Sequence, residues 1–312
     1  MIFDHPLTFA PLYKERIWGG RLLTERLART LPPDSPIGES WELVDREDDQ
    51  SIINHGPHTG LSLHDLWTQH REAVFGPSAP DLPRFPLLAK ILDAREKLSV
   101  QVHPPAHLAT ELKGEPKTEM WYLLDADPEA DLFVGFRDGV TRESFDSSLR
   151  AGTCADLLHR IPVKSGDFIF IPSGRCHAIG AGCFIIEIQQ NSDTTYRVFD
   201  WNRVDAAGKP RDLHIAESLA SIDFNDHEPP LDQAHGETLV SCDYFRVDQW
   251  TLTSTRREGG NTGSVFTVIE GSVRCGGRQF QRGDFFLLPV SANDRDLTPT
   301  TSAAKLLRSI AV

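Results

Sequence analysis

The chain has 312 residues, and its 32 basic and 45 acidic side chains give a formal net charge of −13 at pH 7. Hydrophobic residues make up 39% of it and charged residues 25%, a balance typical of globular proteins. The negative charge argues against nucleic acid or a membrane surface as a partner. An anionic small substrate would need a local cluster of basic residues.

The cysteines and the apolar segments bear on the cellular compartment. The five cysteines are odd in number and form no CxxC pair, which favours free thiols in a reducing compartment. No segment has the pattern of a signal peptide or the length needed to span a membrane. We therefore expect a cytoplasmic protein.

In the first third of the chain, short apolar segments alternate with turns. Residues 7–60 predict short strands, and the apolar spacing at 62–74 predicts a helix with Ser62 as its N-cap. A continuous apolar run at 85–93 predicts a buried strand. Lys90 lies inside this run, where it either extends to solvent at a strand edge or belongs to a cavity.

The rest of the chain continues the pattern with few helices. One or two short helices are expected between 141 and 160, another near 213–221, and a Pro- and Asp-rich linker at 223–233. Further strands are expected at 167–171, 183–189, 244–247, 265–269 and 285–288. Many short strands at close spacing predict a mainly β protein, a barrel or a sandwich that carries helical insertions.

Two of the expected strands form a weak internal repeat in the sequence. The segment Ser-Gly-Asp-Phe-Ile-Phe-Ile-Pro at 165–172 is echoed by Arg-Gly-Asp-Phe-Phe-Leu-Leu-Pro at 282–289. The first copy continues to Gly174 and His177, whereas the second continues without a histidine. We interpret the second copy as structural.

Three short segments contribute side chains of the types that bind metals. Alternation in the strand expected at 98–103 places Ser99, Gln101 and His103 on one face. Glu119 opens the next apolar run, and His177 follows the strand at 167–171. Two imidazoles, one carboxylate and one amide oxygen can fill most of the shell of a divalent ion and leave a position for water or substrate.

Each of these residues also has an ordinary structural interpretation. A histidine taken alone is more often a hydrogen-bonded core residue or a surface residue than a ligand, and Gln101 alone fits a hydrogen-bonding strand position. His107 is expected on the surface, because two prolines preclude a helix that would join it to His103. The thiol of Cys176 is expected to be inert.

The spacing of these residues resembles the motifs of a known family. Gly166-x5-Pro172-x-Gly174-x2-His177 looks like the second motif of the cupin barrels, and Gln101-x-His103 followed by Glu119 resembles the first, with glutamine in place of its leading histidine. Together with the segments at 85–94, 99–104, 116–121 and 196–201, these motifs make the chain similar to the type I phosphomannose isomerases in their short bacterial form. The resemblance runs from about Leu7 to the C-terminus.

The resemblance implies a fold. It predicts a mainly β protein with two cupin-type jelly-roll barrels (a bicupin) and small helical insertions. Residues 1–235 would form a catalytic cupin domain. Residues 236–312 would form a second, degenerate cupin-like domain without metal ligands.

The resemblance also implies an activity and a cofactor. It predicts an isomerase with one zinc ion per chain that interconverts mannose 6-phosphate and fructose 6-phosphate through an enediol or enediolate. The zinc ligands carried over from the family are Gln101, His103, Glu119 and His177. Two alternatives remain: a non-haem iron oxygenase, since two histidines and a carboxylate also bind iron, and a non-catalytic sugar-binding or regulatory cupin.

The remaining site residues follow from the same resemblance. Arg197, Lys117 and Glu187 match catalytic positions, and Ser99 and Lys90 match positions expected at the phosphate group. An arginine can hold an enediolate or a phosphate oxygen because its planar guanidinium stays charged. The residue that moves the proton is Glu187, Lys117 or a water on the zinc.

Overall fold

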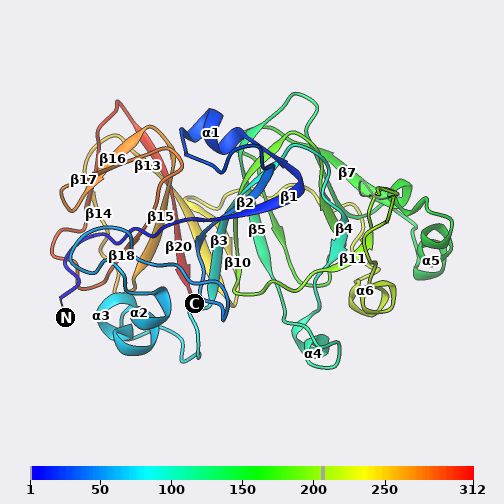
Figure 1. Cartoon of the computed structure of the whole chain (residues 1–312), viewed down its shortest axis with the longest axis horizontal. Coiled ribbons are helices and arrows are strands. Elements are labelled where there is room, and N and C mark those ends of the chain that lie inside the picture. The colour runs from blue at the N-terminus through cyan, green and yellow to red at the C-terminus, as the bar shows by residue number, and fades with distance from the viewer. Residues whose placement is uncertain (1, 205–207) are drawn as a thin grey trace.

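Two β barrels lie side by side along the long axis of the computed structural model, which describes residues 2–204 and 208–312 (Figure 1). Within these residues the strands form four sheets, two in each barrel. The small helices lie outside the barrels (Figure 1). The mainly β fold expected from the sequence is confirmed.

The first barrel is built from strands between residues 12 and 199. Its larger sheet has the order β1 (Leu12–Gly20), β2 (Ile37–Leu43), β3 (Leu87–Ala94), β10 (Cys183–Gln190), β5 (Glu119–Ala126), β8 (Phe168–Ile171). Its smaller sheet has the order β11 (Tyr196–Phe199), β4 (Val100–Val102), β9 (His177–Ile179), β6 (Asp131–Phe136), β7 (Leu158–Pro162).

The second barrel is built from strands between residues 238 and 311. Its larger sheet has the order β12 (Thr238–Ser241), β13 (Phe245–Leu252), β20 (Ala304–Ala311), β15 (Ser264–Glu270), β18 (Phe285–Leu288). Its smaller sheet has the order β14 (Arg256–Arg257), β19 (Asp296–Pro299), β16 (Ser272–Cys275), β17 (Arg278–Gln281).

The internal repeat extends to the whole topology. The strand order β3-β10-β5-β8 in the first barrel recurs as β13-β20-β15-β18 in the second, and β4-β9-β6-β7 recurs as β14-β19-β16-β17. The two segments that resemble each other in sequence are β8 and β18, and each forms one edge of its larger sheet. The short sequence repeat is therefore the visible part of a repeated barrel.

The central strands β3, β5 and β10 are buried on both faces, which explains their continuous apolar runs. One face of these strands belongs to a core cluster that also contains Val265, Leu287 and Leu307 of the second barrel. The other face, with Trp121 and Ile185, belongs to the interior cluster of the first barrel. Polar residues two positions along a strand from members of this second set, such as Glu119 and Glu187, therefore also point into the first barrel.

Helices fill the connections. They are α1 (Leu22–Leu27), α2 (Leu63–Gln69), α3 (Arg71–Phe75), α4 (Ala106–Ala109), α5 (Arg142–Arg150), α6 (Ile215–Ser221) and the 3-10 turn η1 (Cys154–Leu157). Ser62 caps α2 as predicted, with its side chain accepting from the Asp65 N–H. No helix among the described residues is long and apolar enough to cross a membrane.

Two sequence expectations differ from the structure. The helix expected at 62–74 is two helices, because His70 leaves the helical backbone conformation with a φ of −134°. The helical region expected up to residue 160 ends earlier, because residues 158–162 form β7 and pair with β6. That pairing is a long-range contact, which overrides the local helical pattern.

The N-terminal segment crosses to the second barrel. The Leu7 N–H donates to the Leu287 carbonyl at 2.8 Å, and the Leu287 N–H donates back at 2.9 Å. The division of the chain at residue 235 stays a prediction.

Candidate metal centre and catalytic cavity

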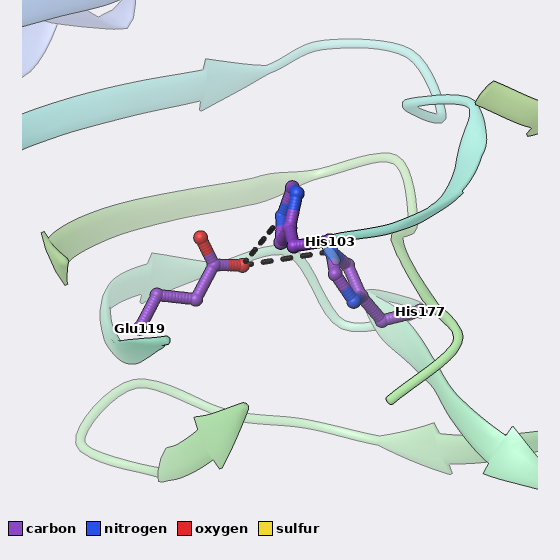
Figure 2. A group of neighbouring side chains, drawn as sticks. All are labelled: His103, Glu119 and His177. Atoms are coloured by element: carbon purple, nitrogen blue, oxygen red, sulfur yellow. Dashed lines mark ion pairs between the residues drawn. The ribbon is translucent and has the colours of Figure 1, made fainter. Parts of the chain in front are cut away.

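The predicted metal ligands His103, Glu119 and His177 meet inside the first barrel (Figure 2). His103 follows β4, Glu119 opens β5 and His177 opens β9. Glu119 Oε1 lies 3.7 Å from His103 Nε2 and 3.5 Å from His177 Nε2, and all three side chains are buried. Their candidate ligand atoms lie within 4.8 Å of one another.

Backbone carbonyls orient both imidazoles. His103 Nδ1 lies 2.8 Å from the Thr194 carbonyl, and His177 Nδ1 lies 2.8 Å from the Arg175 carbonyl. A carbonyl only accepts hydrogen bonds, so we assign the proton of each neutral ring to Nδ1. Each Nε2 then carries its lone pair on the side of Glu119, which is the tautomer that a metal ligand requires, and His103 Nε2 also lies 3.4 Å from Lys117 Nζ.

The buried environment sets the charges of these groups. Burial, with the nearby His103, lowers the pKa of His177 to about 3, and burial with the Lys117 ammonium lowers the pKa of His103. Burial opposes ionisation of Glu119, but Lys117 and His103 outweigh it and hold the pKa of that carboxyl well below its usual range. At neutral pH the group therefore offers two neutral imidazoles and one carboxylate.

The residues present fit a divalent metal ion. His177 Nε2 and Glu119 Oε1 are buried without a hydrogen-bond partner among the described residues, whereas Glu119 Oε2 is paired with Lys117 Nζ at 2.7 Å. Buried polar atoms seldom stay unsatisfied in folded proteins. Two imidazole nitrogens and a carboxylate oxygen suit a borderline ion such as zinc.

Gln101 lies next to this group, on β4 of the smaller sheet. Its backbone pairs with His177 on one side and with Arg197 on the other. Its side chain has no hydrogen bond within the described ranges and lines a cavity together with Ser99, which agrees with the alternation expected from the sequence. Its role as a ligand stays a prediction.

A polar cavity of about 400 Å³ opens beside the metal-binding group. Six of the predicted site residues line it, and Lys117 joins it to the buried Glu119. The lining consists of Arg16, Trp18, Glu39, Lys90, Leu92, Leu98, Ser99, Gln101, Lys117, Ile179, Glu187, Asp193, Thr195, Arg197 and Arg211. The structure thus brings together all nine residues predicted from the sequence.

Alternating charges connect the cavity wall to the metal-binding group. Lys90 Nζ lies 3.8 Å from Glu39 Oε2 and 3.1 Å from Glu187 Oε1. Lys117 Nζ lies 3.8 Å from the same Glu187 oxygen and 2.7 Å from Glu119 Oε2. Because every member is buried, these charges stabilise one another in a medium of low polarity. Lys90 is therefore a cavity residue and does not reach solvent at a strand edge.

Arg197 and Arg211 both line the cavity. Arg197 lies on β11, and its Nη1 donates to the Asp212 carbonyl at 2.7 Å. Arg211 donates to both carboxylate oxygens of Asp200, at 2.7 and 2.5 Å. The Asp200 carboxylate is a structural support that offsets charge on Arg211 and Arg203, whereas Arg197 donates to a neutral carbonyl and keeps its positive charge at the cavity.

Sequence reasoning missed Arg16, Glu39 and Arg211 as cavity residues. Arg16 donates through Nε to Glu39 Oε1 at 2.8 Å, so the two form one group in the cavity wall. No local pattern distinguishes them, because their approach depends on the pairing of β1 with β2. Arg211 lies beyond β11 in an irregular segment, where sequence periodicity gives no signal.

Two residues near the site have structural environments that agree with their expected roles. His107 is exposed on α4 and is not among the three grouped metal-binding residues. Cys176 is fully buried, and burial raises the pKa of its thiol well above the usual value. The thiol therefore stays protonated and does not compete as a ligand.

Comparison with known proteins gives consistent matches. A family model described as phosphomannose isomerase type I, catalytic domain, matches residues 7–134. The chain is 40% identical over 303 residues to mannose-6-phosphate isomerase ManA of Bacillus subtilis, covering 93% of this chain and 94% of that protein. It is 36% identical to mannose-6-phosphate isomerase of Streptococcus mutans, covering 91% and 92%.

Solved structures show the same architecture over both barrels. The crystal structure of mannose 6-phosphate isomerase from Bacillus subtilis matches with a TM-score of 0.87 and 33% identity, covering 98% of this chain and 99% of that one. A putative mannosephosphate isomerase from Archaeoglobus fulgidus matches with a TM-score of 0.79 and 22% identity, covering 99% and 98%. The cupin-type double barrel predicted from the sequence is confirmed.

Proposed function

Since this chain belongs to the type I phosphomannose isomerase family, we propose that it interconverts mannose 6-phosphate and fructose 6-phosphate with a zinc ion held by Gln101, His103, Glu119 and His177. The observation that carries the proposal is the buried group of two imidazoles and a carboxylate beside a cavity lined by basic residues. The free cysteines support a cytoplasmic location.

The donor set supports zinc. Neutral imidazoles, a carboxylate and an amide oxygen form a mixed nitrogen and oxygen shell of the kind that zinc accepts. The amide ligand and the neighbouring cations argue against the iron oxygenase alternative. When bound, the ion would supply positive charge that stabilises negative charge developing on the substrate oxygens.

Isomerisation of an open-chain aldose requires a proton to move between C1 and C2. Burial opposes charge on Lys117, but Glu119 and Glu187 outweigh it and raise the pKa of the ammonium, so Lys117 stays protonated and donates. The Trp121 N–H donates to Glu187 Oε2 at 3.1 Å, and Glu187 Oε1, which makes no hydrogen bond in the described structure, lies 3.1 Å from the Lys90 ammonium. Glu187 is the group best placed to accept the carbon-bound proton.

Positive groups in the cavity would bind the anionic parts of the substrate. Arg197 and Arg211 stay charged and can each contact a phosphate or enediolate oxygen. Ser99 adds a hydroxyl, and Lys90 adds charge that it shares with Glu187 and Glu39. This local cluster provides the positive site that a phosphorylated substrate needs in a protein with a net charge of −13.

A coupled assay with mannose 6-phosphate tests the proposal. We expect purified protein to contain about one zinc per chain, to lose activity on chelation, and to regain it when zinc is added. Magnesium added at the same concentration is the control, because it prefers an octahedral shell of oxygen ligands. Absence of isomerisation by zinc-loaded protein would overturn the proposal, and stoichiometric iron with activity restored by iron alone would favour the oxygenase.

A further inference from the structure

The carbonyl of Arg175 orients His177, and the side chain of Arg175 is itself fixed at three points. Arg175 Nε donates to Asp226 Oδ2 at 2.8 Å and Nη2 donates to Oδ1 at 3.0 Å, while Nη1 donates to the Phe170 carbonyl at 2.7 Å. Both partners are largely buried, with 17% and 16% of the Arg175 and Asp226 side chains exposed. A two-point arginine–carboxylate contact fixes orientation as well as distance.

The turn that contains Arg175 is short and tightly bonded. Gly174 has a φ of +94°, a conformation in which a side chain would be strained, and its N–H donates to the His103 carbonyl at 2.9 Å. The Arg175 N–H donates to the Pro172 carbonyl at 3.1 Å. One turn therefore connects the backbones next to both candidate imidazole ligands.

Asp226 is held in place by the same sheet that carries His177. Its carbonyl accepts from the Phe136 N–H at 2.9 Å, and the Glu228 N–H donates to the Phe136 carbonyl at 2.8 Å. Phe136 ends β6, which pairs with β9 through Val134 and His177. The backbone of Asp226 is thus bonded to β6, and its side chain is bonded to Arg175, two residues before His177 in the neighbouring strand β9.

We propose that Asp226 is a positioning residue for the metal centre, acting through Arg175 to hold the carbonyl that orients His177. This inference rests on the proposed metal site. Without the contact between Asp226 and Arg175, the Arg175 carbonyl would be oriented less firmly. The His177 ring that bonds to this carbonyl would then vary in orientation, and so would the direction of its Nε2 toward Glu119. The loss would weaken metal binding, because partners that orient a ligand typically change metal affinity by about 10- to 100-fold.

The test compares metal affinity in wild-type protein and Asp226→Asn. Asparagine has nearly the same shape but replaces one acceptor oxygen with an amide group, so the two-point contact is lost. Competition with a chromophoric chelator measures zinc affinity, and the visible absorption of cobalt-loaded protein reports ligand geometry. We expect about 10- to 100-fold weaker zinc binding and a changed cobalt spectrum.

Glu237→Gln is the matched control. Glu237 makes a two-point contact with Arg256 in the second barrel, at 2.6 and 2.8 Å. Neither of these two residues bonds to His177 or to Arg175 in the described structure. Arg175→Ala should weaken zinc binding as Asp226→Asn does, and the double variant should add no further loss, because both changes break one contact. Arg175→Lys keeps the positive charge but lacks the planar guanidinium that makes the two-point contact. It serves as the test if Asp226→Asn does not fold.

The outcomes separate the two proposals. Wild-type affinity and an unchanged cobalt spectrum in folded Asp226→Asn and Arg175→Lys would overturn the positioning role and leave the metal site intact. A wild-type protein that binds no metal would overturn the proposed function itself.

Discussion

Lys90 and Glu187 face each other across β3 and β10, and the second barrel has a pair of opposite polarity at the same place. They are the fourth residue of β3 and the fifth of β10, the positions that Asp248 and Arg308 occupy in β13 and β20. Asp248 and Arg308 are also paired in register, with Arg308 Nη1 3.3 Å from Asp248 Oδ2. The repeated barrel thus keeps an interior ion pair with its charges exchanged.

The metal-binding positions of the first barrel also have equivalents in the second barrel. Glu258 follows β14 as His103 follows β4, and Ser264 opens β15 as Glu119 opens β5. Arg308 donates to both oxygens of Glu258, at 2.7 and 3.0 Å. Among the described residues of the second barrel, no three side chains of the metal-binding types come together. An internal ion pair lies where the first barrel has a metal-binding group.

Removal of Glu258 should destabilise the protein without affecting the metal. Glu258→Ala leaves the largely buried Arg295 without an ion-pair partner and Arg308 with Asp248 alone, and loss of one member of a buried pair typically lowers the free energy of unfolding by about 3–5 kcal/mol. Denaturant unfolding measures this loss, and zinc content should stay at the wild-type level. A drop in zinc content in the folded variant would contradict the structural role.

Removal of Arg197 should impair turnover and leave the metal bound. Arg197→Ala deletes a positive charge from the cavity, and loss of one group that stabilises developing negative charge costs about 10²-fold or more in kcat. Steady-state kinetics with metal analysis on the same sample checks this expectation. Unchanged turnover would show that Arg197 has no catalytic role.

Removal of His177 should abolish metal binding and activity together. His177→Ala deletes one of two imidazoles that can hold the ion, whereas His107→Ala changes an exposed histidine and serves as the control. Metal analysis and the isomerase assay are measured in parallel. A His177→Ala protein with full activity would remove this residue from the site.

Asp93 should make stability depend on pH. Burial, opposed by the Leu22 N–H and Arg95 and assisted by Glu25 and Asp127, raises its pKa to about 6. An acid whose pKa is raised in the folded state contributes stability that is present below its ordinary pKa and is lost as the pH rises through the folded value. The contribution should fall by about 3 kcal/mol between roughly pH 4 and pH 7.

Asp93→Asn isolates this contribution. The asparagine oxygen can still accept from the Leu22 N–H, which lies 2.7 Å from Asp93 Oδ2, but it does not titrate. The free energy of unfolding of the variant should therefore rise relative to wild type as the pH rises over this range. A constant difference between the two proteins would contradict the raised pKa.

Much of the site was predictable because its signals are local. Alternation within one strand places Ser99 and Gln101 on the same face, and the motif around Gly174 marks the turn before His177. These patterns need only a few consecutive residues. The resemblance to a family then assigned roles that the residues alone left open.

The remaining features depend on contacts between distant segments. Glu39 and Arg16 enter the cavity wall through strand pairing, and the support of His177 by Asp226 crosses from the linker after α6 to β9. The break in the helix at His70 and the strand β7 in a region expected to be helical were also not predicted, because they too depend on contacts beyond the local sequence. Periodicity reports which face of an element is buried, but it does not report which segment covers that face.

The separation of the three metal-binding residues along the sequence has a consequence for folding. His103 directly follows β4, Glu119 opens β5 and His177 opens β9, so the three approach one another only where these segments, distant in sequence, are brought together. Contacts between distant segments form late, because closing long loops costs conformational entropy before any contact forms. The ion would thus arrive at a nearly finished barrel, so it should slow unfolding while leaving the rate of refolding unchanged.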